Sequence, residues 1–225
     1  MKTVYCISGL GSDERVFQNL TIADVHIECL QWLIPSKDET IESYSRRMSL
    51  QIQDPDPILI GLSFGGMMAI EMAKDLSIQK IILVSSVKSQ KELPAWMKLC
   101  GKLNLNSVIP SKSPKWFGPI ANMYLGAIGT NEKKLAQDYR NTVSPVYLHW
   151  AVDKIVNWQN SYQPPILFHI HGTHDRMFPI RLVQPTHIVQ GGGHFMIMNR
   201  ADEISQIIQQ MITLPDISHL FRREP

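Results

Sequence analysis

The sequence predicts an α/β protein with a doubly wound, mostly parallel sheet of about six strands and helices on both faces. Three observations carry this prediction. Short runs of β-branched and aromatic residues alternate along the chain with segments of helical periodicity. The segment 64–76 is apolar on nearly every side, as expected of a helix packed against the middle of such a sheet. The alternation stops over residues 88–163 and then resumes, which indicates an insertion.

The expected elements follow one another in a regular order. Strands are expected at 3–8, 26–31, 57–60, 80–85, 166–171 and 186–189. Helices are expected at 12–20, 39–53, 64–76 and 201–212, the last with its isoleucines on one stripe. Residues 1–87 and 164–225 would then form one core, with 88–163 inserted into it as a helical lid. The clearest lid helix begins at Ser144-Pro145, a capping serine followed by proline at the first helical position.

The composition restricts the classes of partner. The chain of 225 residues is 44% hydrophobic and carries a formal charge of +2 from 22 basic and 20 acidic side chains. Because these charges are dispersed, no surface for nucleic acid or an anionic membrane is expected. Three cysteines without close spacing argue against a disulfide framework, and the short N-terminal apolar run argues against a signal peptide or membrane span. We expect a cytoplasmic protein with a small-molecule partner; its oligomeric state is left open.

One hydroxyl stands among apolar residues and glycines in the stretch ILIGLSFGGMMAI, residues 58–70. The part Gly61-Leu62-Ser63-Phe64-Gly65 has the G-x-S-x-G pattern of a nucleophile elbow, a sharp turn between a strand and a helix. Its glycines would let the strand and the helix approach each other closely. A simple connecting turn is the alternative, but the expected strand before it and helix after it favour Ser63 as a nucleophile.

A nucleophilic serine needs a base, and the base needs an orienting acid. Asp175 follows the expected strand 166–171, and His194 follows the last expected strand in the sequence GGGHF. Both would therefore lie beyond the carboxyl ends of strands, where open α/β sheets bind their ligands. The chain order serine, aspartate, histidine is the one found with G-x-S-x-G elbows. His174, next to Asp175, is the one competitor for the role of base.

Together these residues resemble the α/β-hydrolase superfamily, and the resemblance extends from the first strand to the last helix. It implies the α/β-hydrolase fold, with Ser63 as nucleophile, His194 as general base and Asp175 as orienting acid. Some members carry the acid after the preceding strand. Here Ser85-Ser86-Val87 follows that strand, which favours Asp175.

The resemblance also implies an oxyanion hole formed by backbone N–H groups. The first donor would be Phe64, directly after the nucleophile, and the second Leu10, in the loop Ser8-Gly9-Leu10-Gly11-Ser12. The family usually has a histidine where this chain has Ser8, so the hydrogen bonding that shapes the loop is expected to differ. The donor itself is a backbone group and does not depend on that side chain.

Two cofactor sites are weaker alternatives. Gly9-x-Gly11, with Glu28 near the end of the next strand, resembles a dinucleotide fingerprint, but the third glycine is missing and Asp13 and Glu14 would repel a pyrophosphate. A metal site is suggested by the three histidines of the fifth strand and its loop, which lack a clear cysteine or carboxylate ligand set. These histidines are His169, His171 and His174. We therefore expect neither a metal nor another cofactor.

Aromatic residues of the insertion are candidates for a substrate pocket. They are Trp96, Trp116, Phe117, Tyr147 and Trp150. Aromatic residues at helical spacing more often pack against their own domain, which is the alternative interpretation for each of them.

The expected function is hydrolysis of a small carboxylic ester through an acyl-enzyme. Thioester, amide and carbon–carbon bond hydrolysis stay open, because the same three residues can serve each of them. Hydroxynitrile lyase and cofactor-free oxygenation chemistry are more distant alternatives. From a different class, a slow-turnover ligand sensor acting through a partner protein would retain the same residues.

Overall fold

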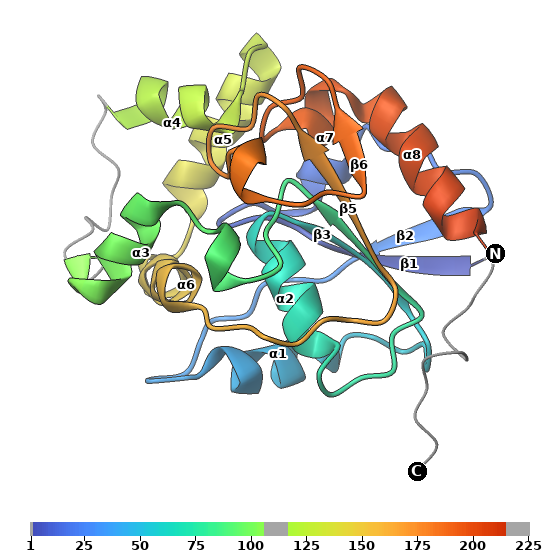
Figure 1. The fold of residues 1–225 in the computed structure, drawn as a ribbon, viewed down its shortest axis with the longest axis horizontal. Coiled ribbons are helices and arrows are strands. Elements are labelled where there is room, and N and C mark those ends of the chain that lie inside the picture. The colour runs from blue at the N-terminus through green and yellow to red at the C-terminus, as the bar shows by residue number, and fades with distance from the viewer. Residues whose placement is uncertain (1, 106–116, 215–225) are drawn as a thin grey trace.

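A six-stranded parallel sheet forms the centre of the molecule (Figure 1). The computed structural model describes residues 2–105 and 117–214. The strands are β1 (Lys2–Ile7), β2 (Val25–Cys29), β3 (Ile58–Leu62), β4 (Lys80–Val84), β5 (Leu167–Gly172) and β6 (His187–Val189). Their order in the sheet is β2-β1-β3-β4-β5-β6, and every neighbouring pair is parallel. The predicted sheet of about six mostly parallel strands is thereby confirmed.

Helices cover both faces of the sheet, as Figure 1 shows. One face carries α1 (Ile41–Ser49) and α2 (Phe64–Met72), and the other carries α7 (Met196–Asn199) and α8 (Ala201–Thr213). Between β4 and β5 lie α3 (Ala95–Lys102), α4 (Phe117–Leu125), α5 (Thr130–Thr142) and α6 (Pro145–Asn157). Short 3₁₀ helices occur at Glu14–Phe17, Gln90–Glu92 and Ile180–Leu182. None of the described helices is long and apolar enough to cross a membrane.

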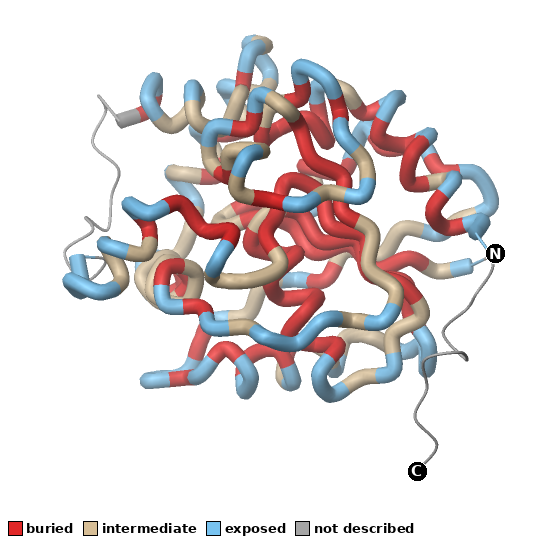
Figure 2. Tube along the Cα trace, viewed as in Figure 1, coloured by how far each residue is buried: buried red, intermediate tan, exposed pale blue. Residues whose placement is uncertain are grey.

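The core consists of two apolar layers, one on each side of the sheet. Because side chains alternate along a strand, Tyr5 and Ile7 of β1 enter one layer while Val4 and Cys6 enter the other. All residues of β3 and β4 are buried, since helices cover them on both sides (Figure 2).

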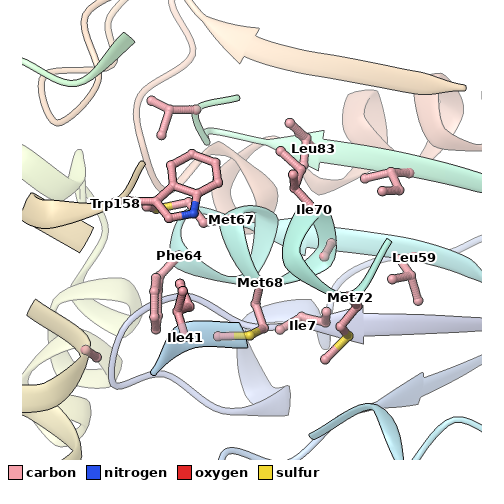
Figure 3. Close-up of a cluster of buried hydrophobic side chains, with 14 of the residues drawn as sticks. Ile7, Ile41, Leu59, Phe64, Met67, Met68, Ile70, Met72, Leu83 and Trp158 are labelled. Atoms are coloured by element: carbon pink, nitrogen blue, oxygen red, sulfur yellow. The ribbon is translucent and has the colours of Figure 1, made fainter. Parts of the chain in front are cut away.

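α2 is buried around its whole circumference, which explains its apolar composition. Phe64, Met68 and Met72 lie toward β1 and α1 in Figure 3, while Ile70 lies toward Leu83 of β4. Burial of such side chains stabilises the fold by about 1.5–3 kcal/mol each. The turn that carries Ser63 therefore continues into a helix that is buried on all sides.

Two buried charged residues fix helices to this core. Glu71 of α2 accepts hydrogen bonds from Lys74 Nζ at 2.6 Å and from Trp158 Nε1 at 2.8 Å, which ties α2 to the end of α6. Lys80, at the start of β4, donates through Nζ to the Met211 and Ile212 carbonyl oxygens at 3.1 and 3.0 Å. These carbonyls lie at the C-terminus of α8, where a cation is favourable.

Several helix boundaries differ from those expected. The helix expected at 12–20 is only the 3₁₀ helix Glu14–Phe17, begun by the Asp13 side chain, which accepts from Arg15 N at 3.0 Å. The helix expected at 39–53 is the shorter α1, where Thr40 Oγ1 accepts from Ser43 N at 3.2 Å. α6 begins at Pro145 as predicted, although the Ser144 side chain makes no capping hydrogen bond.

Candidate active site

The turn after β3 holds Ser63 in a conformation that is rare for a residue with a side chain. Its φ is 53° and its ψ is −118°, in the positive-φ region that favours glycine. Its carbonyl oxygen accepts from Ser86 Oγ at 2.6 Å and from Gly66 N at 3.0 Å, and its N–H donates to the Val84 carbonyl oxygen at 3.0 Å. The strained turn is therefore held by hydrogen bonds from the neighbouring strand end and from its own helix.

The glycines flanking Ser63 are required by close contacts. A Cβ on Gly61 would lie 2.6 Å from the Gly65 carbonyl oxygen, and a Cβ on Gly65 would lie 2.5 Å from the Ser8 carbonyl oxygen. Both approaches are shorter than real Cβ contacts. The glycines thus let strand, helix and the loop after β1 meet at one point, as the sequence pattern predicts.

Ser63, His194 and Asp175 form a continuous chain of hydrogen bonds. Ser63 Oγ lies 3.0 Å from His194 Nε2, and His194 Nδ1 lies 2.8 Å from Asp175 Oδ2. A carboxylate can only accept, so Nδ1 carries the proton and Nε2 is left to accept from the serine hydroxyl. His194 and Asp175 are each only 4% exposed. The structure brings together the three residues that the sequence predicts.

The loops that carry Asp175 and His194 are hydrogen-bonded to each other. His174 N donates to the Gly192 carbonyl oxygen at 2.8 Å, and Gly191 N donates to Thr173 Oγ1 at 2.8 Å. A Cβ on Gly172 would lie only 2.9 Å from the Gly192 Cα, so the two loops need these glycines to approach. The spacing between Asp175 and His194 is therefore set by backbone contacts at the edge of the sheet.

The expected oxyanion donors lie on two segments that meet at Ser63. Phe64 N begins α2, and a Cβ on Gly9 would lie 3.4 Å from the Ser63 Cβ, which places the Leu10 loop beside Ser63. Within residues 2–105 and 117–214, neither the Leu10 nor the Phe64 N–H makes a backbone hydrogen bond. Both remain available to a ligand oxygen.

Two buried histidines lie behind Asp175. His171 Nε2 is 2.7 Å from the Phe178 carbonyl oxygen, to which it must donate, and 3.6 Å from Asp175 Oδ2. His171 Nδ1 then accepts from His169 Nε2 at 3.1 Å. Asp175 Oδ1 in turn accepts from the N–H groups of Met177 and Phe178 at 2.8 and 2.9 Å. Two backbone N–H groups therefore hold the Asp175 carboxylate, and His171 fixes Phe178, which supplies one of them. The sequence prediction did not assign this role to His171.

Burial keeps this histidine pair neutral. Desolvation lowers the pKa of His169 to about 3 and also lowers the pKa of His171. The described residues include no group of three His, Cys, Asp or Glu side chains arranged to hold a metal ion. The two rings are instead hydrogen-bonded to each other and to the backbone.

Replacing His169 by Gln is expected to make stability less sensitive to acid. Both rings have a pKa below the usual 6.5 when folded, so the unfolded chain binds more protons as the pH falls below 6.5. Stability that is complete above that pH is then lost progressively toward the pKa of about 3. Gln retains an N–H donor for His171 Nδ1 but takes up no proton.

The measurement is the melting temperature at about pH 7 and about pH 5. The wild-type value should fall more over this interval than that of His169→Gln, whereas the control His187→Gln should behave as wild type. An equal fall in wild type and His169→Gln would contradict the assignment.

The residues expected to line a pocket lie in different places. Tyr147 and Trp150 of α6 are packed near Phe64: the Trp150 and Phe64 ring centroids are 6.2 Å apart, and Tyr147 is buried. Trp96 is 52% exposed on α3. Trp116 lies outside the described residues, and so does the side chain of Phe117, whose backbone begins α4.

A groove of about 630 Å³ opens beside the acid loop. It is lined by Met123, Tyr124, Thr173, His174, Asp175, Arg176, Pro179, Ile180 and Arg181. Its two arginines, Arg176 and Arg181, are exposed, whereas the Asp175 carboxylate is buried and hydrogen-bonded to His194 and the backbone. The sequence prediction missed it because its two walls come from segments about fifty residues apart in the chain.

The fold is shared with solved structures of low sequence identity. The chain is similar to an esterase from Thermogutta terrifontis with malate bound, at 12% identity and a TM-score of 0.70, covering 94% of this chain and 89% of that one. It is similar to a meta-cleavage product hydrolase from Pseudomonas fluorescens, at 13% identity and a TM-score of 0.65, covering 94% and 90%. It is also similar to a bromoperoxidase from Bacillus anthracis, at 14% identity and a TM-score of 0.67, covering 94% and 91%.

Sequence comparison identifies the family. A comparison with curated proteins gives no significant match. The model of the alpha/beta hydrolase family, in contrast, matches residues 3–207, which include all of the sheet except Lys2 and all three residues of the hydrogen-bonded chain. The protein therefore belongs to the alpha/beta hydrolase family.

Proposed function

We propose that the protein is a serine hydrolase that cleaves a small carboxylic ester through an acyl-enzyme. The observation that carries this proposal is the chain from Asp175 through His194 to Ser63, with both bonds at 3.0 Å or less and the serine on a strained turn. This is the arrangement by which a weak nucleophile is activated. The proposed reaction requires no cofactor.

Each residue has one role in the proposed reaction. Ser63 Oγ attacks the carbonyl carbon while His194 Nε2 takes its proton, and the N–H groups of Phe64 and Leu10 stabilise the negative oxygen that forms. The protonated His194 then gives its proton to the leaving alcohol. A water molecule then attacks the acyl carbonyl carbon while the same nitrogen takes its proton. His194 returns this proton to Ser63 Oγ as the bond between Oγ and the acyl carbon breaks and the acid leaves. Asp175 keeps the proton on Nδ1 and stabilises the imidazolium.

A small substrate is favoured by the aromatic side chains next to the nucleophile. Trp32, Tyr147 and Trp150 surround Phe64, with ring centroids between 5.3 and 6.3 Å apart in neighbouring pairs. Because these rings pack around the residue that follows Ser63, we infer that they leave little space for a long acyl chain. We further propose that helices α3–α6 act as a lid, because α6 supplies two of these rings to the site.

The decisive experiment combines covalent labelling with a substrate panel. A fluorophosphonate should add one adduct to the intact protein at Ser63, and the adduct should be absent from Ser63→Ala. Short-chain p-nitrophenyl esters should be hydrolysed by the wild type and not by Ser63→Ala, with kcat/KM falling as the acyl chain lengthens. Ser205→Ala, which removes a serine hydroxyl far along the chain on α8, is the matched control and should retain both properties.

Other outcomes would redirect or contradict the proposal. Faster turnover of the matching thioesters would reassign the substrate class while keeping the mechanism. Labelling of Ser63 without turnover of any ester or thioester would favour a ligand sensor. A protein that is not labelled while a control hydrolase reacts would contradict the role of Ser63.

A further inference from the structure

Trp32 lies in the loop after β2 and contacts both segments that carry the proposed oxyanion donors. Its Nε1 donates to Ser8 Oγ at 2.8 Å, at the start of the loop that contains Leu10. Its ring is stacked on Phe64, with centroids 5.3 Å apart and planes inclined by 8°. Tyr147 contacts Trp32 as well, with centroids 5.3 Å apart. The indole is thus held between the nucleophile helix and α6.

The donor and acceptor roles in the hydrogen bonds that link Trp32, Ser8 and Ser12 are fixed. The indole N–H can only donate and the Ser12 carbonyl oxygen can only accept, so Ser8 Oγ accepts from Trp32 and donates to Ser12 at 2.7 Å. Ser8 is 3% exposed, and the hydroxyl has both a donor and an acceptor partner. Without the indole N–H, this buried serine would lose one of its partners.

The same turn fixes the direction of the Leu10 N–H. The Gly9 carbonyl oxygen accepts from Ser12 N at 3.1 Å and from Ser12 Oγ at 3.0 Å. In a trans peptide the Leu10 N–H points opposite to the Gly9 C=O, so holding the carbonyl holds the donor. Trp32, Ser8 and Ser12 therefore form a continuous connection from the Phe64 ring to the peptide that supplies the second donor.

We infer that Trp32 is a positioning residue for the oxyanion hole: it sets the distance between the Phe64 and Leu10 N–H groups through its ring stack and its bond to Ser8. It touches no reacting atom. This inference rests on the proposed function, because an oxyanion forms only if Ser63 attacks a carbonyl. A donor displaced from the developing charge should reduce kcat and leave KM nearly unchanged, since the oxyanion exists only in the transition state.

The test is Trp32→Phe, which keeps a ring for the stack and removes the N–H. We expect kcat for a short-chain ester to fall about tenfold, with KM changed by less than about twofold. The inhibition constant of a short alkyl boronic acid, which forms a tetrahedral adduct with the serine, should rise by a similar factor. Ser8→Ala should give the same effects, and the double variant should be no worse than either single one.

The matched control is Trp158→Phe. It removes the N–H that Trp158 donates to the buried Glu71, so it should lower the melting temperature while leaving kcat unchanged. An unchanged kcat in Trp32→Phe, an effect on KM alone, or additive effects in the double variant would overturn the inference. Absence of Ser63-dependent hydrolysis in the wild type would instead contradict the proposed function, so the two failures are distinguishable.

Discussion

His194→Ala should lower kcat for ester hydrolysis by about 10⁴-fold or more while leaving the fold intact. The side-chain oxygen of Ser63 has one hydrogen-bond partner among the described side chains, His194 Nε2 at 3.0 Å, so its loss leaves the hydroxyl without a base. Initial rates with the preferred short-chain ester and the rate of fluorophosphonate labelling at Ser63 measure the effect. Both should fall together, because both require a deprotonated serine.

His26→Ala is the control for this experiment, since His26 is exposed on the edge strand β2 and should not affect the rate. His174→Ala tests the other histidine that the sequence offers as a base. Its side chain is exposed and lies in the groove beside the acid loop, so we expect little loss of activity. If His194→Ala retained more than about a tenth of the rate, another base would have to be assigned.

Asp175→Asn should reduce kcat by about 10⁴-fold, by changing the tautomer of the base. The N–H groups of Met177 and Phe178 both donate to Oδ1, so the asparagine must place its carbonyl oxygen there. Its NH₂ group then faces His194 Nδ1 and can only donate to it. The proton of the imidazole moves to Nε2, which can no longer accept the proton of Ser63.

The matched control is Asp75→Asn. Asp75 forms a surface ion pair with Arg46, so this variant should retain a rate within about twofold of wild type. Rates and melting temperatures are measured for both variants in parallel. A fully active Asp175→Asn would show that this carboxylate does not orient the base. A variant that loses activity only because it unfolds would be recognised by its melting temperature.

The sheet and the three central site residues could be predicted because local rules determine them. Strand composition and alternation identified six strands, and the ends of β3, β5 and β6 then had to share one edge of the sheet. Helix lengths were predicted less well. The first expected helix is only the 3₁₀ helix Glu14–Phe17, where Asp13 and Arg15 bond to each other and Arg15 also pairs with Asp138 of α5.

The supporting residues of the site could not be predicted in the same way. Trp32 contacts Ser8 only after segments 24 residues apart have packed together. His171 contacts Asp175 within one turn after β5, but neither residue belongs to a recognisable motif. A partial signal was present for His171: it shares a strand face with His169, and its strand leads directly to Asp175. For Trp32 the chain offered no signal beyond an aromatic residue soon after a strand.

The hydrogen bond between Ser63 and His194 has a consequence for how the protein folds, since it joins residues 131 positions apart. The loop between them contains β4, helices α3–α6 and β5, and its closure entropy must be overcome before the contact contributes any stability. A folding intermediate that has assembled only β1–β4 carries the serine on its turn but has no base to activate it. Under the proposed mechanism, Ser63 would therefore gain its base only when the last strand has joined the sheet.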